Sequence, residues 1–376
     1  MAQEVSGGYR GSLTDPVPGQ QGAPRDIDLV LITGAGASRE FGSNRQKLPL
    51  MADWSNAIVQ KLISAGPNYL EAIGLVNNMS GEAFESRLGD FLREVDAFSR
   101  IGTLLEPSAK FPGVPTNLMP QTIVEWHRQA GFHFDRITSL VHETLFDQFN
   151  LERIASTPAI QAYGELFSQL EVTPQTSIVY STTNYDSLGE HALLGLGRKP
   201  DCGELLPIRG APDPPLAVGN LLAGMPRFTP VLHLHGKVGW YFRKDDQQVH
   251  ATGTSRHDPN FGVPIVMLPD PAKAYDGDVI SAIWSDFVGA LVRTKRVLVL
   301  GHSLADNVLL KALRDYVTPP ARLAVTVFGQ TIDDSSPVAD RVRKHLPGAA
   351  VIPTMFGIDP KVGSVELSEW LKFSKT

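Results

Sequence analysis

Short, uninterrupted apolar runs recur along this chain, and several of them end directly in small or polar residues. Continuous apolar and β-branched runs of this length are typical of parallel strands that are covered on both faces. The pattern therefore predicts a sheet whose strands are buried on both sides. The predicted strands are Asp28–Thr33, Ser177–Ser181, Pro230–Leu234, Arg296–Leu300, Leu323–Phe328 and Ala350–Thr354.

Between about Asp53 and Val172 the apolar positions change to helical spacing. In Glu82–Phe98 the large apolar residues recur every three or four positions, as on one face of an amphipathic helix. A proline-rich break at Pro107–Pro120 interrupts the helical stretch. Further helices are predicted at Phe134–Phe149, Ala159–Leu170 and Val279–Thr294.

The alternation of strands and helices predicts an α/β fold with a doubly wound, mostly parallel sheet of the Rossmann-like type. We expect one domain over residues 26–376, interrupted by a large helical insertion at about 54–175. Residues 1–25 are rich in Gly, Pro, Gln and Ser, which predicts an arm that is disordered or that orders on a partner. Pro- and Gly-rich residues 200–228 are expected to form a loop over the site.

Composition and charge exclude several classes of function. The 376 residues are 42% hydrophobic and 20% charged, as in ordinary globular proteins, and the formal net charge is −6. An acidic chain without a basic tract does not favour direct nucleic-acid binding. Cys202 is the single cysteine, so neither an internal disulfide nor a four-cysteine zinc module can form. With a polar N-terminus and no membrane-length apolar run, we expect a cytoplasmic protein without membrane contact.

Candidate chemistry lies at the ends of four predicted strands: Gly34–Ser38, Thr183–Asp186, His235-Gly236 and Gly301–Leu304. Ligands of open parallel sheets bind at the carboxyl ends of the strands, so these four segments should meet at one crevice. Glycines at 34 and 36 would let backbone amides approach a pyrophosphate at the start of the next helix. Each segment alone also has a structural reading, such as strand–helix packing for the glycines or an Asx turn for Asn184.

Together the four segments resemble the sirtuin superfamily. Gly34-Ala35-Gly36-Ala37-Ser38 is similar to its first NAD loop, and Thr183-Asn184-Tyr185-Asp186 is similar to its Gln-Asn-x-Asp motif, with threonine in place of glutamine. Leu234-His235-Gly236 resembles the strand end with the catalytic histidine, and Gly301-His302-Ser303-Leu304 resembles the Gly-x-Ser-Leu motif. The resemblance implies that NAD is bound by Gly34, Ala35, Gly36, Ser38, Thr183, Asp186, Gly301, Ser303 and Leu304, and that Asn184 and His235 are catalytic.

Two departures from that pattern narrow the expectation. The four cysteines of the deacylase zinc module are absent, and Leu48-Pro49-Leu50 with Asp53-Trp54 replaces the family's Pro-Asp-Phe-Arg stretch. This combination resembles the sirtuin-like NAD-cleaving effectors of prokaryotic antiviral defence. It implies an NAD hydrolase without zinc that depletes NAD in abortive infection, forms a homo-oligomer and pairs with a separate hexameric DNA-translocating ATPase.

Cleavage of the nicotinamide–ribose bond develops oxocarbenium character on the ribose, while nicotinamide leaves as a neutral molecule. In this reading Asn184 holds the ribose hydroxyls or the attacking water, and His235 takes a proton from one of them. Asp186 accepts a hydrogen bond from the nicotinamide amide. We interpret His233 as structural or supporting, His302 as shaping its loop, and Asp306 as a helix cap that also has the reach to contact a ribose. A protein deacylase and a non-catalytic NAD or ADP-ribose sensor are the alternatives.

Overall fold

The computed structural model describes most of the chain from Asp26 onward. The described residues are 26–42, 47–48, 50–66, 69, 83–84, 87–91, 94–95, 98, 121–149, 156–205, 214–243, 245–252, 261–266, 278–332 and 336–373. The predicted arm at 1–25 and the proline-rich break at 107–120 lie outside these residues.

Seven strands of the described chain form one sheet in which every neighbouring pair is parallel. The predicted α/β class with a parallel sheet is therefore confirmed. In spatial order the strands are β10 (Ala350–Thr354), β9 (Leu323–Phe328), β8 (Val297–Leu300), β1 (Leu29–Thr33), β2 (Ile178–Thr182), β4 (Thr229–His233) and β3 (Pro200–Asp201).

The strand order reverses between β1 and β8. From β1 the chain adds β2 and β4 on one side, and it later returns to add β8, β9 and β10 on the other. A reversal of this kind opens a crevice at the carboxyl ends of the two central strands. Here those ends are Thr33 and Leu300, which are paired in the register of β1 and β8.

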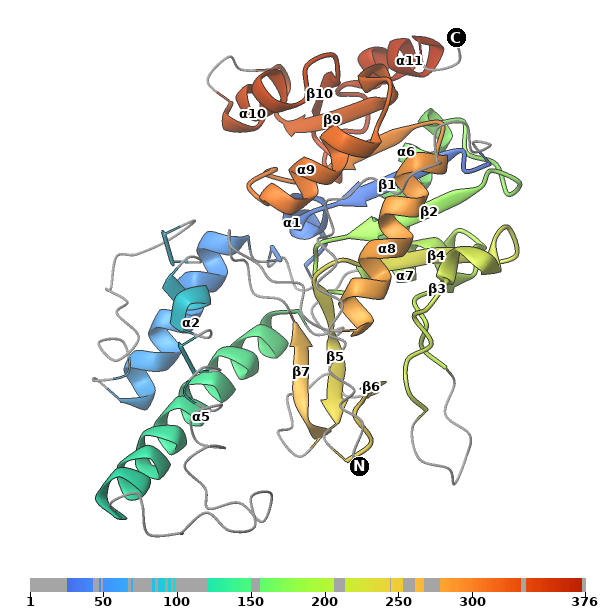
Figure 1. Ribbon diagram of the computed structural model, residues 1–376. Helices are drawn as coiled ribbons and strands as arrows, with labels where there is room; N and C mark the ends of the chain where they lie inside the picture. Colours follow the sequence, from blue (N-terminus) through green and yellow to red (C-terminus); the bar gives the residue numbers. More distant parts are fainter. Residues whose placement is uncertain are drawn as a thin grey trace.

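Helices cover both faces of the sheet, as the buried strands require (Figure 1). On one face lie α6 (Ser156–Gln169), α7 (Leu188–Gly195) and α11 (Ser364–Phe373), and α6 contacts both of the others. The other face carries α8 (Asp278–Arg293) and α9 (Asn307–Tyr316), with α10 (Pro337–His345) beside β9. Short helical turns are α1 (Ala35–Ser38), η1 (Arg39–Phe41), η4 (Leu221–Gly224) and η6 (Pro320–Arg322).

Beside the main sheet lies a second hydrophobic cluster built on α2 (Met51–Ala65) and α5 (Gln121–Phe149), which pack against each other (Figure 1). Phe84, Leu88 and Phe91 of the predicted amphipathic helix belong to this cluster. Helix α6, in contrast, packs into the core of the main sheet. The limits proposed for the helical insertion stay a prediction.

A small antiparallel sheet lies between the two clusters and was not predicted. It consists of β5 (Gly236–Arg243) flanked by β6 (Gln248–Ala251) and β7 (Val263–Val266). Tyr241 of β5 is fully buried in the second cluster, whereas Trp240 beside it belongs to the main core. The strand that begins at Gly236, the residue after His235, therefore contributes side chains to both clusters.

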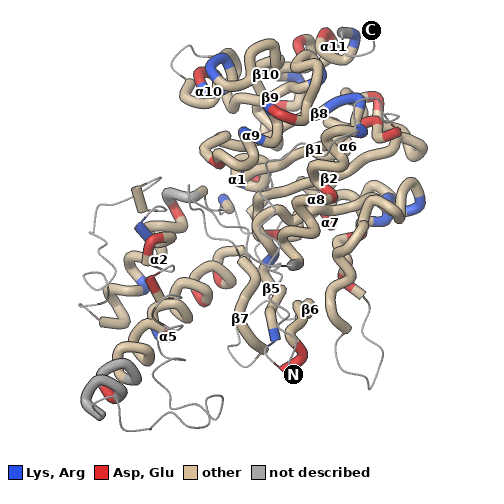
Figure 2. Tube along the Cα trace, viewed as in Figure 1, with Lys and Arg blue, Asp and Glu red and all other residues tan. Residues whose placement is uncertain are grey.

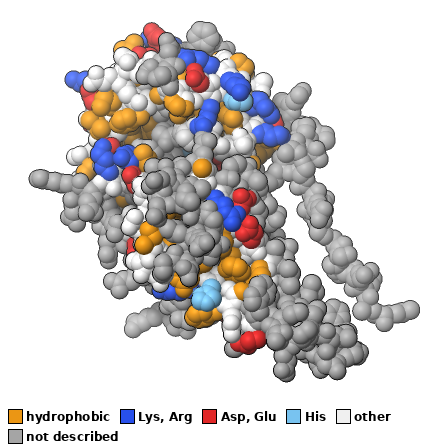
Figure 3. Space-filling model, turned by 90° about the vertical axis from the view of Figure 1, so that its left-hand side faces the viewer, with side chains coloured by type: hydrophobic (Ala, Val, Ile, Leu, Met, Phe, Trp, Pro, Cys, Tyr) orange, Lys and Arg blue, Asp and Glu red, His pale blue; other side chains and the backbone are white. Residues whose placement is uncertain are grey.

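Charged residues of both signs are interspersed along the described chain (Figure 2). On the face shown in Figure 3, basic and acidic side chains lie next to one another between apolar ones, without a broad patch of one sign among the residues that are coloured. Within the described helices, none is both long and apolar enough to cross a membrane.

Candidate functional site

The loops that follow β1 and β8 are in direct contact at the point where the strand order reverses. The amide of Gly36 donates a hydrogen bond of 2.9 Å to the carbonyl oxygen of Gly301, and the Gly34 amide donates to Leu300. Gly301 has a φ of +63°, and a Cβ built on it would lie 2.2 Å from the Ala37 nitrogen. These glycines therefore allow two backbone loops to approach each other closely.

That contact changes the expected role of the first glycine loop. The amides of Gly34, Gly36 and Ala37 all donate to backbone carbonyls of the protein itself, and not toward open space. These three amides, which the glycine loop was expected to present to a pyrophosphate, are thus used within the fold. The assignment of Gly34, Ala35, Gly36 and Ser38 to cofactor binding stays a prediction.

Asn184 links the turn after β2 to the first glycine loop. Its Nδ2 atom donates to the carbonyl oxygen of Gly34 at 3.1 Å and to the Ser38 hydroxyl at 2.8 Å. Because a carbonyl oxygen can only accept, this bond fixes the orientation of the Asn184 amide. The side-chain oxygen Oδ1 then remains as an acceptor that no described residue occupies.

Asp186 is a buried carboxyl in the same turn. One oxygen accepts the Leu188 amide at 2.9 Å, whereas Oδ2 has no hydrogen-bond partner among the described residues. Burial raises the pKa of Asp186 above its usual range, and the Leu188 amide and the Ser38 hydroxyl only partly oppose the shift. Between Asn184 and Asp186, Tyr185 anchors the turn by packing edge-on against Phe149 at 5.6 Å between ring centroids.

His235 follows β4 and forms a buried pair with a residue far along the chain. Its Nε2 atom lies 2.9 Å from Oδ2 of Asp306, and each side chain is only 7% exposed. Asp306 also caps helix α9, because its Oδ1 accepts the amides of Val308 and Leu309. The predicted cap is confirmed, and the contact with His235 is an additional role that the sequence did not show.

A chain of contacts places Asn184 and His235 at the same edge of the sheet. Asn184 binds the Gly34 loop, which abuts His302, and Asp306 after that loop holds His235. A further contact lies directly after β4, where the Leu234 amide donates to the Thr182 carbonyl at the end of β2 at 2.9 Å. Both residues therefore lie at the carboxyl ends of the central strands, as their positions after parallel strands predict.

The remaining predicted residues belong to the loops at the same edge of the sheet. Thr183 donates its amide to Thr33 at the end of β1. In the loop after β8, the ring of His302 accepts the Leu304 amide, and Leu304 is fully buried with a φ of +56°. Ser303 is exposed, and its carbonyl accepts a hydrogen bond from Arg341 of α10. The ring of His302 thus shapes its own loop, as expected.

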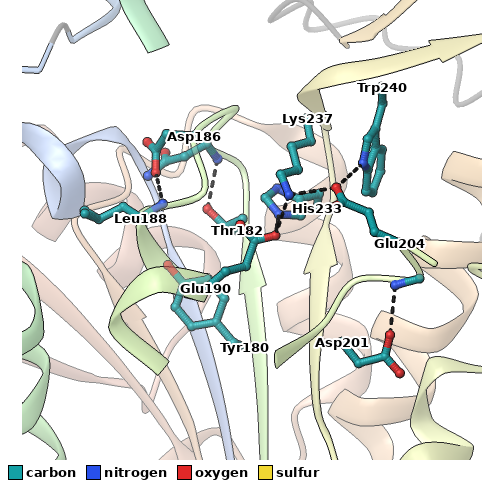
Figure 4. Close-up of polar contacts among 12 residues, drawn as sticks. Tyr180, Thr182, Asp186, Leu188, Glu190, Asp201, Glu204, His233, Lys237 and Trp240 are labelled. Atoms are coloured by element: carbon teal, nitrogen blue, oxygen red, sulfur yellow. Dashed lines mark hydrogen bonds and ion pairs between the residues drawn. The ribbon is translucent and has the colours of Figure 1, made fainter. Parts of the chain in front are cut away.

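A cluster of polar side chains next to His235 was missed from the sequence. Glu190 of α7 accepts from Lys237 at 2.9 Å and lies 3.0 Å from Nε2 of His233 (Figure 4). Lys237 also contacts Glu204, which accepts the indole N–H of Trp240. The one available signal was the pair of polar residues that flank His235, at 233 and 237.

The described residues contain no group of three or more His, Cys, Asp and Glu side chains that could hold a metal ion. Cys202 is buried, and burial raises the pKa of its thiol. A buried thiol with a raised pKa is a weak nucleophile.

Comparison with known proteins places a recognised domain over this site. Residues 178–319 match the model of the SIR2-like domain, which is less than half of the chain. This segment is sirtuin-like. It runs from β2 to just beyond α9, and it therefore contains Asn184, Asp186, His235 and Asp306 but not the loop at Gly34–Ser38.

The chain was also compared with curated proteins and with solved structures. No curated protein matches the chain. Among solved structures, that of Sir2Tm bound to a propionylated peptide aligns over 93% of this chain and 93% of that chain, with 10% sequence identity and a TM-score of 0.34.

Proposed function

We propose that this protein binds NAD in the crevice between β1 and β8 and hydrolyses its nicotinamide–ribose bond. The observation that carries the proposal is the convergence of Asn184 and the His235–Asp306 pair at the switch point of a parallel sheet. All three residues lie within the segment that matches the SIR2-like domain. The products would be nicotinamide and ADP-ribose, in its linear or cyclised form.

Polar atoms that the fold itself does not use support a fit to this substrate. Oδ1 of Asn184 can accept a hydrogen bond from a ribose hydroxyl or from a bound water. Oδ2 of Asp186 is buried without a partner among the described residues, and a carboxamide N–H would satisfy it. A nicotinamide riboside carries hydrogen-bond donors of both kinds, hydroxyl groups on its ribose and N–H groups on its carboxamide. The pyrophosphate would lie beside the two glycine loops.

The His235–Asp306 pair supplies the base. The carboxylate of Asp306 orients the imidazole and stabilises its protonated form, as the acid of a catalytic triad does. His235 can therefore take a proton from a ribose hydroxyl or from the attacking water at neutral pH. Since nicotinamide leaves as a neutral molecule, the site needs no strong general acid at the leaving group. Positioning of this kind typically lowers the barrier by several kcal/mol, and base catalysis typically adds about 10²–10⁴-fold.

The biological setting proposed for this activity is depletion of cytoplasmic NAD in antiphage defence, with a homo-oligomer controlled by a hexameric DNA-translocating ATPase. This part of the proposal rests on the resemblance of the four motifs and on the missing cysteines alone. Uncontrolled hydrolysis of NAD would harm the host, which is the reason to expect restraint by a partner.

The deciding experiment measures nicotinamide released from NAD by the purified protein, alone and with any co-purifying partner. Asn184→Ala and His235→Ala should each lower the release about 10²-fold or more, and His191→Ala, which removes an exposed histidine of α7, should not. Release at the parent rate from both site variants would refute the assignment. Release that requires an acylated peptide would indicate a deacylase, and NAD binding without release would indicate a sensor.

A further inference from the structure

Glu190 lies between the two turns that carry the proposed catalytic residues. It belongs to the first turn of α7, and α7 begins directly after the turn of Asn184 and Asp186. Its two partners are His233 and Lys237 (Figure 4), which lie two residues before and two residues after His235 in the chain. One carboxylate oxygen, Oε1, therefore contacts the chain on both sides of His235.

The surroundings make this contact a strong one. The side chains of Glu190, Lys237 and His233 are 12%, 11% and 1% exposed, respectively. Although burial opposes ionisation, Lys237 and His233 hold the pKa of Glu190 well below its usual range, and Glu190 raises the pKa of Lys237. Glu190 and Lys237 are therefore both charged at neutral pH, and because the site is poorly hydrated, solvent screens their attraction only weakly.

We propose that Glu190 is a positioning residue, which locks the His235 turn against the Asn184 turn through Lys237 and His233. The proposal rests on the proposed function, in which these two turns act on the same substrate. Backbone contacts alone join the turns at few points, such as the Val238 amide on the Tyr185 carbonyl. Glu190 adds a charged link between them, and its hydrogen bonds go to His233 and Lys237 rather than to Asn184 or His235.

Lys237 offers a matched control, because two carboxylates share it. Glu204 contacts the same ammonium group at 2.8 Å, but it comes from the segment after β3, and its hydrogen bonds go to Lys237 and Trp240, both on the His235 side. In Glu190→Gln the lysine keeps Glu204, and in Glu204→Gln it keeps Glu190, so neither variant leaves a buried charge unpaired. Only the first weakens the link between the two turns.

The test compares these variants with the parent in three measurements. Nicotinamide release at saturating NAD should fall about a hundredfold in Glu190→Gln, as expected for a small misplacement of a base. The NAD dissociation constant should change less than about threefold, because the charged link acts on geometry and not on ground-state binding. In Glu204→Gln both quantities should stay at the parent value. Equal losses of rate in the two variants would overturn the proposal.

The third measurement does not depend on activity. In imidazole spectra of the ¹⁵N-labelled protein, with the His235 signal assigned by its loss in His235→Ala, Glu190→Gln should shift that signal and Glu204→Gln should not. If the parent releases no nicotinamide, the proposed function fails, and the spectra still decide whether Glu190 positions His235. An unshifted His235 signal would overturn the inference. Should Glu190→Gln not fold, Glu190→Asp, which keeps the charge but shortens the reach, takes its place with the same expectations.

Discussion

The imidazole of His235 lies 2.9 Å from the carboxylate of Asp306, although 71 positions separate the two residues in the chain. Asp306 serves two purposes, because one oxygen faces His235 and the other caps helix α9. The base proposed for the reaction is thus held by the start of a helix, which is a rigid support. This arrangement connects the residues after β4 to the loop after β8.

Asp306→Asn separates the two roles of this residue. Asparagine caps helices about as well as aspartate, so the stability should change by less than about 1 kcal/mol. The neutral amide cannot stabilise an imidazolium, so nicotinamide release should fall by about 10²–10⁴-fold. Thermal unfolding and nicotinamide release, measured on the same preparation, check both expectations. A variant with the parent rate would remove Asp306 from the mechanism.

Much of the fold could be predicted because its strands are buried on both faces. Such strands read as continuous apolar runs, and β1, β8, β9 and β10 lie within a residue of their predicted ends. The sheet of β5, β6 and β7 was missed because it joins two cores. Its buried residues, such as Trp240 and Tyr241, are consecutive but point into different cores. They therefore form neither the strict alternation of a half-buried strand nor the continuous apolar run of a fully buried one.

The candidate site was predictable only as far as it lies at strand ends. Asn184, Asp186 and His235 each follow a parallel strand directly, and topology then brings them to one edge. Glu190 lies inside a helix, and Asp306 looks like an ordinary cap, so neither carries a local signal of its contact with a distant histidine. Pairings of this kind depend on the three-dimensional arrangement of the elements.

Gly301→Ala should destabilise the protein, because the added Cβ would lie 2.2 Å from the Ala37 nitrogen at a φ of +63°. A strained left-handed residue together with overpacking of two backbone loops should lower the free energy of unfolding by about 2–4 kcal/mol. Urea denaturation measures the change.

Gly289→Ala provides the control, since its Cβ would meet only a Leu222 methyl group at an ordinary 3.6 Å inside helix α8. An alanine there should raise the stability by up to about 1 kcal/mol through helix propensity. If both alanines had the same effect, the close approach of the two loops would not be a determinant of stability.

Asp186→Asn should stabilise the fold at neutral pH. Burial raises the pKa of Asp186 in the folded state above 3.8, so folding favours the protonated form. The stability contributed by the protonated group is complete below the unfolded pKa, and it is lost as the pH rises through the folded pKa. Asparagine keeps the acceptor for the Leu188 amide without the charge.

The measurement for Asp186→Asn is urea unfolding between about pH 4 and pH 8. The advantage of the variant over the parent should be largest at the alkaline end and should shrink toward the acidic end. A variant that is less stable than the parent at the alkaline end would show that contacts such as the Leu188 amide and the Ser38 hydroxyl outweigh the cost of burying the ionised carboxylate.

Glu190→Gln should flatten the acid side of the stability profile. Lys237 and His233 depress the pKa of Glu190 in the folded state, while its usual value is 4.5. Between the lowered pKa of the folded state and the usual pKa, the unfolded chain therefore binds one more proton than the folded chain.

The stability that Glu190 contributes is complete above about the usual pKa and is lost as the pH falls below it, by about 1.4 kcal/mol per pH unit. The glutamine variant lacks this dependence, so its unfolding free energy should fall less steeply below pH 4.5. Glu204→Gln keeps the Glu190 pair and should retain the slope of the parent. Equal slopes in all three proteins would mean that Lys237 and His233 do not lower the pKa of Glu190 in the folded state.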